Sequence, residues 1–278
     1  MSARMSRRSW MTAAGMATMA VPAVAAIDGF LITPRRLVTS THRFGEPSGS
    51  RIRLLQISDV HLQRIGGLEE RLLAAVHDAA ADLIVLTGDM IDRADRLWQL
   101  EMLLRELPRG PRTVAILGNW EYWSGVRIPA LERTYDRHGI ELLVNRSIEV
   151  ETPAARLRIT GLDDLRAGAP DAAAALADAP PARHHLVLAH CPASRDRVSL
   201  PGDHAAALLL AGHTHGGQVA PLGVPLVRPI GSGRYLAGWY RDDGLPPMYV
   251  SRGIGTSKIP VRIGSSPELV QIDWGVGA

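Results

Sequence analysis

Residues 83–92 read LIVLTGDMID, and this segment indicates the fold more directly than any other. Its first four residues are a continuous run of branched apolar side chains, which is typical of a strand buried on both faces. Asp89 follows the predicted strand 83–87 after a single glycine. Ligands of open α/β sheets bind beyond the carboxyl ends of the strands, so a carboxylate in this place indicates a site there.

The same junction between an apolar run and a polar side chain follows four other predicted strands, 52–57, 113–117, 185–189 and 207–211. The side chains after the five strands are Asp59, His61, Asp89, Asn119, His190, His213 and His215. Chance can supply one or two such junctions, but five that all carry Asp, His or Asn indicate a common origin. We expect the seven side chains to converge at one edge of a sheet.

The rest of the chain completes an α/β pattern. Apolar runs predict strands at 140–144, 147–151, 156–160, 247–251 and 268–273, and helical periodicity predicts helices at 67–81, 95–107, 127–138 and 171–178. Alternation of strands and helices favours an α/β sheet core. Strands without intervening helices gather toward the C-terminus, which suggests a second sheet with more antiparallel pairing.

The predicted site combines two carboxylates, four imidazoles and one carboxamide. Mixed nitrogen and oxygen ligands suit divalent Mn, Fe, Zn or Co, and the single cysteine, Cys191, excludes both a cysteine-rich zinc site and an internal disulfide. Two ions about 3.5–4 Å apart can activate a water and hold the oxygens of a phosphoryl group during an in-line displacement. A carboxylate must bridge such a pair, and Asp89 is the candidate.

These motifs, taken in order, resemble the signature of calcineurin-like metallophosphoesterases over residues 50–273. They are Asp59-Val60-His61, Gly88-Asp89-Met90-Ile91-Asp92, Gly118-Asn119-Trp120-Glu121, His190 and Gly212-His213-Thr214-His215. The segments 216–218 and 251–256 resemble the exported or membrane-associated bacterial branch of that superfamily. The resemblance implies two packed mixed β-sheets flanked by helices.

The resemblance also implies how the site is divided. One metal is held by Asp59, His61, Asp89 and His215, and the second by Asp89, Asn119, His190 and His213. We predict Asp89, Asn119 and His190 as the catalytic residues.

The sequence departs from the family pattern at Trp120, where the usual residue is a histidine that helps to protonate the leaving group. An indole N–H donates a hydrogen bond but gives up no proton near neutral pH. Loss of a general acid costs on the order of 10² to 10⁴ in rate unless the leaving group is a weak base. Family members that cleave a nucleotide-lipid pyrophosphate also lack this histidine, which favours a pyrophosphate or an activated diester here.

The first 25 residues resemble a twin-arginine signal peptide, with Arg7-Arg8, a weakly apolar run and the small-residue site Ala23-Val24-Ala25. A retained membrane anchor is the alternative. We expect 26–50 to be a linker and 51–278 to be the metallophosphoesterase domain, exported to the periplasm or the outer face of the cytoplasmic membrane. The segment also carries Arg4 and no acid, so removing its three arginines lowers the net charge of +3 to 3 − 3 = 0, which disfavours a nucleic-acid partner.

Several other residues have alternative interpretations. Asp92 either contacts a ligand or begins a helix, Trp120 either stacks on substrate or packs, and Glu121 either orients a neighbour or lies in solvent. Asp163 and Asp164 are predicted to shape a turn, Cys191 to fill a small buried space, and Arg228–Tyr240 either to form a substrate rim or to be a solvated loop. The remaining histidines, His42, His77, His138, His184, His185 and His204, are predicted to be structural or on the surface.

The function most consistent with these residues is hydrolysis of a phosphodiester or pyrophosphate of an envelope lipid or cell-wall component. The expected partners are a phosphorylated lipid or small molecule, the twin-arginine export machinery and a membrane surface. Two alternatives remain, a metal-retaining binding protein that Trp120 has made inactive and a nucleic-acid phosphodiesterase.

Overall fold

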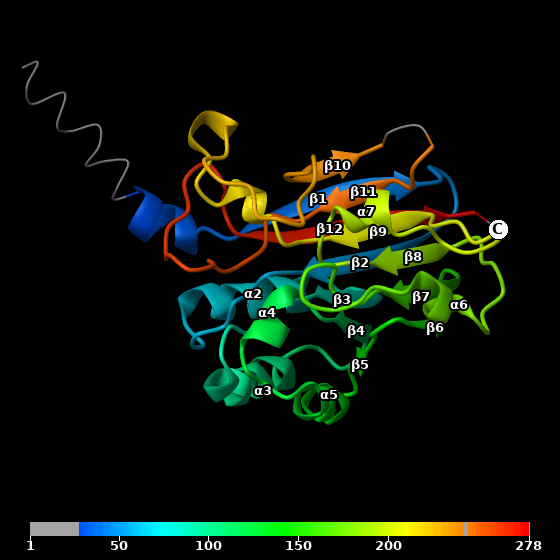
Figure 1. Ribbon diagram of the computed structural model, residues 1–278, viewed down its shortest axis with the longest axis horizontal. Coiled ribbons are helices and arrows are strands. Elements are labelled where there is room, and N and C mark those ends of the chain that lie inside the picture. The colour runs from blue at the N-terminus through cyan, green and yellow to red at the C-terminus, as the bar shows by residue number, and fades with distance from the viewer. Residues whose placement is uncertain (1–27, 242–243, 278) are drawn as a thin grey trace, which may run out of the picture.

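The computed structural model describes residues 28–241 and 244–277, which form two six-stranded sheets with helices on their outer sides (Figure 1). The first sheet has the order β1 (Val38–Gly45), β12 (Glu268–Val276), β2 (Ser50–Ile57), β3 (Leu83–Thr87), β4 (Arg112–Ile116) and β5 (Glu141–Leu142). The second has the order β10 (Gly238–Tyr240), β11 (Met248–Val250), β9 (Leu208–Ala211), β8 (His185–Leu188), β7 (Arg156–Gly161) and β6 (Arg146–Glu151). The predicted fold class, two mixed sheets flanked by helices, is confirmed.

Strand direction brings the predicted site together. Strands β2 to β5 are parallel in the first sheet, and β7, β8, β9 and β11 are parallel in the second. The loops that leave β2, β3, β4, β8 and β9 carry the seven candidate residues. Antiparallel pairing occurs once in the first sheet, between β12 and β2, and twice in the second, at its two edge pairs.

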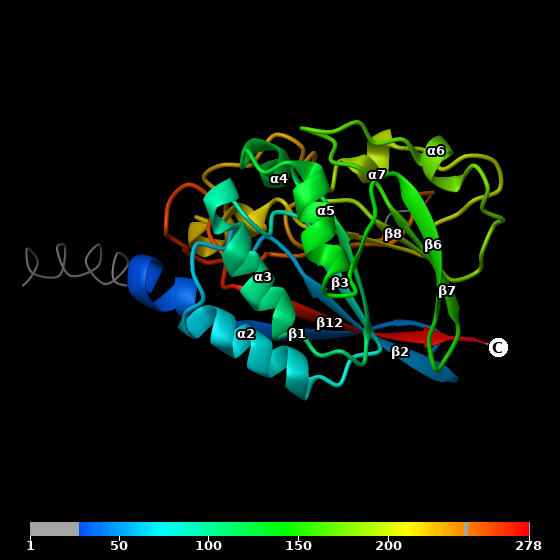
Figure 2. The same cartoon turned by 90° about the horizontal axis from the view of Figure 1, so that it is seen from below.

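Six α-helices connect these strands. Figure 2 shows α2 (Gly67–Asp78), α3 (Leu97–Arg105) and α5 (Ile128–Asp136) along one side of the molecule, and α6 (Ala172–Leu176) lies beside β6 and β7. The four predicted helices therefore exist, with shorter ends. Two others, α4 (Asn119–Trp123) and α7 (Ser194–Arg197), were not predicted because one turn is too short to show a helical period.

Short helical turns complete the connections: η1 (Asp28–Ile32), η2 (Thr33–Arg35), η3 (Ala94–Arg96), η4 (His215–Gly217) and η5 (Pro221–Gly223). Among residues 28–241 and 244–277, no helix has the length and apolar character needed to cross a membrane.

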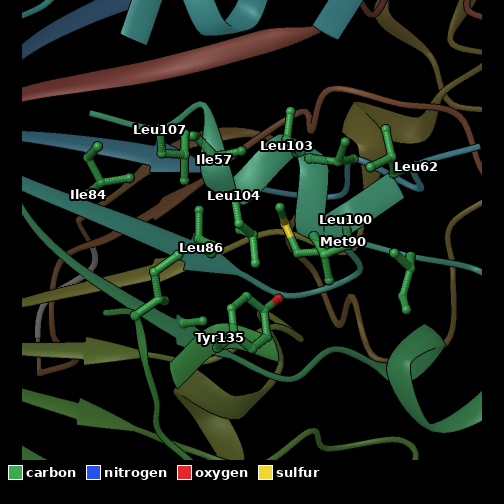
Figure 3. Packing of buried hydrophobic residues seen from close by; sticks show 14 of the residues in the cluster. Ile57, Leu62, Ile84, Leu86, Met90, Leu100, Leu103, Leu104, Leu107 and Tyr135 are labelled. Carbon is green, nitrogen blue, oxygen red and sulfur yellow. The ribbon is translucent and has the colours of Figure 1, made fainter. Parts of the chain in front are cut away.

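The core explains why the polar residues lie at the strand ends. Along β3, Leu83 and Val85 face the second sheet, and Ile84 and Leu86 face the helices. Figure 3 shows Ile84 and Leu86 packed with α3 and α5. Both faces of the strand therefore exclude water. An unpaired polar side chain within it would cost several kcal/mol, and an unpaired charge would cost far more. The first places free for ligands are the loops.

The predicted linker 26–50 is wrong in its second half. Residues 38–45 form β1, which pairs in parallel with β12 along its whole length. Only one face of this edge strand is half-buried, and its residues Thr39 to His42 are polar, so no apolar run marked it. The predicted signal segment, 1–25, lies outside the described residues.

Candidate metal centre

The loops of the site have an unusual backbone. Among the described residues ten non-glycine positions have positive φ, and half of them are candidate ligands: Asp59 (52°), His61 (47°), Asp89 (54°), His213 (70°) and His215 (52°). Such conformations cost about 1–3 kcal/mol each and persist where the surrounding structure enforces them. Here the loops bond to each other, since the Asp59 amide donates to Gly88 O at 3.0 Å and the His61 amide donates to Asp89 O at 3.0 Å.

Two glycines allow these loops to approach closely. A Cβ atom at Gly118 would lie 2.3 Å from Asp89 Oδ1, and one at Gly212 would lie 2.0 Å from Ser58 Oγ. The Gly212 Cβ would also lie 2.3 Å from Asp59 Oδ2, so any side chain at either position would push a candidate ligand out of place.

The candidate ligands form two buried clusters. Asp59, His61 and His215 make the first, in which His61 Nε2 lies 2.9 Å from His215 Nε2 and His215 Nε2 lies 3.4 Å from Asp59 Oδ1. The second contains Asp89, His190 and His213. In it His190 Nε2 is 3.1 Å from Asp89 Oδ2 and 3.3 Å from His213 Nδ1.

Asp89 joins the two clusters. Its Oδ2 atom lies 3.1 Å from His190 Nε2 in one cluster and 3.7 Å from His61 Nε2 in the other. Its Oδ1 atom accepts a hydrogen bond from the Trp120 amide at 2.8 Å, which fixes the carboxylate plane. One oxygen of Asp89 is therefore directed at both clusters, as a bridging carboxylate requires.

Three of the four imidazoles donate a hydrogen bond through the ring nitrogen that faces away from the cluster, whereas the outer nitrogen of His215 accepts one from Arg262 at 3.2 Å. His190 Nδ1 donates to Thr87 O at 2.8 Å, and His213 Nε2 donates to Ile230 O at 2.9 Å. His61 Nδ1 donates to Asp92, so of the two interpretations of Asp92 the contact with a ligand is the correct one. A proton fixed on the outer nitrogen leaves the inner nitrogen with a lone pair, which is the form that binds a metal.

Glu121 lies behind this arrangement and not in solvent. Its side chain is completely buried and accepts hydrogen bonds from the amides of Gly118, Asp89 and Met90 at 2.6–2.9 Å. The carboxylate therefore ties the loop after β3 to the loop after β4. Burial, together with the nearby charge of Asp89, raises the pKa of Glu121 to about 7.

The carboxylates and imidazoles of the site shift one another's pKa values. Burial disfavours ionised Asp89, but the neighbouring His190 outweighs this effect and lowers its pKa to about 2. Burial also opposes protonation of His190, yet Asp89 raises its pKa well above 6.5. Burial and the neighbouring His61 hold the pKa of His215 well below 6.5. The carboxylates therefore stabilise positive charge beside them, and a bound metal ion would supply that charge.

The donor set fits two divalent ions. Asn119 Oδ1 is buried and accepts no hydrogen bond from any described residue, although a buried carbonyl without a partner costs about 1–3 kcal/mol. A metal ion beside the second cluster would satisfy this atom. Six histidine and aspartate side chains in two buried groups, together with this oxygen, match the nitrogen and oxygen donors of borderline divalent metals.

A cavity of about 590 Å³ opens onto the site. Asp89, Asn119, His213 and His215 line its inner part. Its walls include Trp120, Trp123, Leu226, Val227, Ile230 and Ile259, and three cations, Arg166, Arg228 and Lys258, also face it. The site is therefore reached through a space with largely apolar walls and a positively charged border.

Trp120 lies at the edge of both the site and the cavity. Its ring packs edge to face against His61, with centroids 6.0 Å apart, and against Trp123 at 5.7 Å. It therefore packs against a candidate ligand and also presents a surface to the cavity.

The predicted rim Arg228–Tyr240 is confirmed only at its start. Arg228, Pro229 and Ile230 line the cavity, whereas Tyr235 is buried and donates to Asp196 at 2.8 Å. Arg166 and Lys258 at the cavity, and Arg262 behind His215, were not predicted from the sequence. Arg262 is completely buried, and its Nη2 lies 3.2 Å from His215 Nδ1. An arginine inside the apolar run 259–263 was the available signal.

The other side chains considered from the sequence are not members of the two candidate clusters. Asp163 and Asp164 shape a turn, since Asp164 Oδ1 accepts from the Arg166 and Ala167 amides at 2.8 and 2.7 Å. Cys191 is a buried filler whose thiol lies 3.3 Å from Asp164. His42, His77, His138, His184, His185 and His204 belong to neither of the two candidate clusters.

Comparison with known proteins agrees with this geometry. The family model for calcineurin-like phosphoesterases matches residues 52–217, which include all seven candidate ligands. The chain belongs to this family. Its activity is therefore hydrolysis of phosphate esters, and its site fits the two divalent ions that such a centre uses.

Two bacterial relatives illustrate the similarity. An uncharacterized metallophosphoesterase of Bacillus subtilis, YkoQ, is 29% identical over 81% of this chain and 84% of its own length. The phosphodiesterase YaeI of Escherichia coli is 30% identical over 83% of this chain and 84% of its own length. Among solved structures, a 5'-nucleotidase precursor from Thermus thermophilus shares the fold with a TM-score of 0.50 at 14% identity, covering 80% of this chain and 55% of that one.

Proposed function

We propose that this phosphoesterase hydrolyses a phosphodiester or pyrophosphate that carries a lipid chain, as a component of the bacterial envelope. The observation that carries the proposal is the composition of the cavity: buried candidate metal ligands, exposed cations and exposed apolar side chains all line it. A small hydrophilic ester would leave the apolar walls in contact with water. A lipid phosphate would cover them and place its phosphoryl group at the metals.

The proposed roles follow from the contacts. Asp59, His61, Asp89 and His215 would hold one ion, and Asp89, Asn119, His190 and His213 the other. Divalent ions bound there would supply an activated water and positive charge for the phosphoryl oxygens. Arg228 and Lys258 are suited to a second phosphate, because both are exposed cations at the cavity.

The absence of a histidine at position 120 narrows the reaction. Tyr122, the nearest other hydroxyl donor in α4, donates to Asp163 at 2.6 Å, and burial together with that carboxylate raises its pKa far above 10. Glu121, the other acidic group of α4, is held by three backbone amides behind the site, so no side chain of α4 is suited to protonate an alkoxide. A phosphate or aryl oxide leaves without that help.

We also propose that the protein works outside the cytoplasm. Support comes from the sequence alone, from Arg7-Arg8 and the weakly apolar run that follows. Replacing both arginines with lysine should leave the protein in the cytoplasmic fraction, and normal export of that variant would contradict a twin-arginine route.

The substrate is tested with matched pairs. Purified protein loaded with Mn, Zn, Fe or Co is assayed on an alkyl pyrophosphate and an alkyl aryl phosphodiester, each with a long chain and with a methyl group instead. We expect both classes to be hydrolysed, the long-chain members with the lower KM. Equal KM values for the two chain lengths would contradict a lipid substrate, and no turnover with any metal would favour the inactive binding protein.

A further inference from the structure

Exposed apolar side chains are concentrated on one part of the molecule. Among the described residues, nine of the twelve exposed large hydrophobic side chains belong to three short segments. They are Phe30, Leu31 and Ile32 in η1, then Leu222, Val224, Leu226, Val227 and Ile230 in and after η5, and finally Ile259. We call these nine side chains the apolar rim.

Backbone contacts join the three segments into one surface. The Arg262 amide donates to Gly29 O at 2.9 Å, which attaches the segment that contains Ile259 to η1. The Ala220 amide donates to Ile263 O at 2.8 Å, and Val219 pairs with Ile263. Figures 1 and 2 both place η1 and these two loops at the same end of the molecule.

The backbone of loop 221–230, which carries five of the exposed apolar side chains, is strained at Leu222. Leu222 is fully exposed and has φ 53°, a conformation that glycine or asparagine adopts more readily than leucine. Prolines 221, 225 and 229 restrict the rest of the loop. Backbone hydrogen bonds from Gly223 to Ala220 at 3.0 Å and from Val224 to Pro221 at 3.1 Å hold this turn, and they keep the Leu222 side chain fully exposed at its tip.

The exposed charge of these segments is positive, since the one acid of η1, Asp28, is half-buried and accepts a hydrogen bond from Thr33 Oγ1 at 2.8 Å. Residues 29–36, 219–231 and 257–263 contain no aspartate or glutamate. They contain four exposed cations, Arg35, Arg36, Arg228 and Lys258. Exposed apolar side chains among cations, without acids, are the composition of surfaces that insert into anionic lipid headgroups.

The position of the apolar rim relates it to the site. Leu226, Val227, Ile230 and Ile259 belong both to the rim and to the cavity wall, so the cavity opens through this surface. The described chain begins at Asp28, next to Phe30, and the apolar run of residues 1–27 therefore joins the molecule here. Both features indicate that the end of the protein with the apolar rim faces a membrane.

We propose that the apolar rim docks on the surface of an anionic phospholipid bilayer, with Leu222 and its neighbours in the headgroup region and the cavity mouth facing the lipid. A phosphorylated lipid then reaches the metal site without leaving the bilayer, and Arg228 and Lys258 lie among its headgroup charges. The reason for docking rests on the proposed lipid substrate, but docking itself is measured without turnover.

The direct test places a reporter on the rim. In the full chain, Leu222→Cys is labelled with a polarity-sensitive fluorophore, and Met102→Cys, exposed on α3, is the matched control. Cys191 is completely buried and should not react. Vesicles of phosphatidylglycerol and phosphatidylcholine should shift the emission of the Leu222 label to shorter wavelength, and brominated acyl chains should quench it. The Met102 label should not respond, even if residues 1–27 tether the protein.

A second test separates docking from catalysis. Leu222→Ser/Val224→Ser removes two rim side chains that do not line the cavity, and Trp98→Ser/Met102→Ser is the control. The rim variant should lose about tenfold in vesicle affinity, as expected for two apolar side chains at an interface, and keep its rate on a soluble aryl diester. Affinity should also fall as salt is raised.

Three results would overturn the proposal. The first is a Leu222 label that does not respond to vesicles, and the second is equal vesicle affinity of the rim and control variants. The third is a shift of the Leu222 label that depends on protein concentration without vesicles, which would identify a second copy of the chain as the occupant. Docking without hydrolysis of any lipid phosphate would instead contradict the proposed function and leave the docking surface intact.

Discussion

Two completely buried histidines at opposite ends of strand β8 have different roles, since one is structural and the other is a candidate metal ligand. His185 begins the strand, and its two ring nitrogens are hydrogen-bonded to Ala205 O at 3.2 Å and Thr160 Oγ1 at 2.7 Å. His190 lies beyond the carboxyl end. Its outer nitrogen is bonded to Thr87 O, but its inner nitrogen faces Asp89 and His213.

The difference lies in what surrounds the two imidazoles. Burial among neutral partners lowers the pKa of His185 to about 4, whereas Asp89 raises the pKa of the equally buried His190 well above 6.5. A buried histidine is structural where neutral groups use both nitrogens. It is a candidate ligand where one nitrogen is directed at a carboxylate and another imidazole.

Substitution of Asp89 should have the largest effect on metal content and activity, because Asp89 is the charged neighbour that distinguishes His190 from His185. Asp89→Ala removes the one oxygen directed at both clusters, so both ions should be lost and activity should fall by about 10³-fold, the upper range for removing one preorganised electrostatic group. Metal analysis and a diesterase assay measure the two effects. Retention of two ions and full rate by the variant would contradict the bridging role.

Substitution of His190 should affect metal binding, whereas substitution of His185 should affect stability. His190→Ala should reduce bound metal from two ions to about one and activity by about 10²-fold. His185→Gln should keep both metals and full activity but lower the free energy of unfolding by about 1–3 kcal/mol, because Thr160 or Ala205 loses a buried partner. Loss of metal from the His185 variant would show that the two ends are not independent.

Asp92 tests whether an outer hydrogen bond matters at the other cluster. Asp92→Ala leaves His61 Nδ1 without its acceptor, and such losses cost about 10- to 100-fold in metal affinity. Asp92→Asn keeps an acceptor and should have a smaller effect. The matched control is Asp95→Ala, an exposed acid that pairs with Arg93. Equal metal affinities for Asp92→Ala and Asp95→Ala would exclude this role for Asp92.

His185 should also make stability depend on pH. An unfolded histidine binds a proton near pH 6.5, whereas folded His185 binds one only near pH 4. The unfolded chain therefore holds more protons in this window, so the contribution is fully present above about pH 6.5 and is lost as the pH falls toward 4, by about 3 kcal/mol at about 1.4 kcal/mol per pKa unit. Urea unfolding of metal-free protein and of His185→Gln measures it. The same pH dependence in both proteins would assign the effect to other groups.

The strands, and the loops that carry the seven candidate ligands, could be predicted because each buried strand is a continuous apolar run that ends in a polar side chain. The resemblance of the ordered motifs added the two-sheet architecture. Strand β1 escaped prediction because an edge strand with one half-buried face can be polar at most positions, and edge strand β10 escaped it because three residues are too few to form a pattern. The role of Glu121 and the placement of Arg166, Lys258 and Arg262 depend on contacts between loops far apart in sequence, and no local pattern encodes them.

Trp120 should give the smallest effect, because the new group in Trp120→His would lack a partner to orient it. In the family pattern the acid after the histidine orients the ring, but Glu121 is bound to three backbone amides and cannot turn toward position 120. A histidine here, with an ordinary pKa of about 6.5, should therefore recover only a small part of the 10²- to 10⁴-fold benefit of general-acid catalysis, about tenfold or less.

The measurement is the slope of log kcat/KM against leaving-group pKa for a series of substituted phenyl diesters. The natural enzyme should show a steep slope, since negative charge on the departing oxygen is not neutralised by a proton, and the variant a slightly shallower one. A flat slope in the natural enzyme would mean that another group already donates the proton. A variant that regains the full benefit would mean that a group other than Glu121 orients the ring.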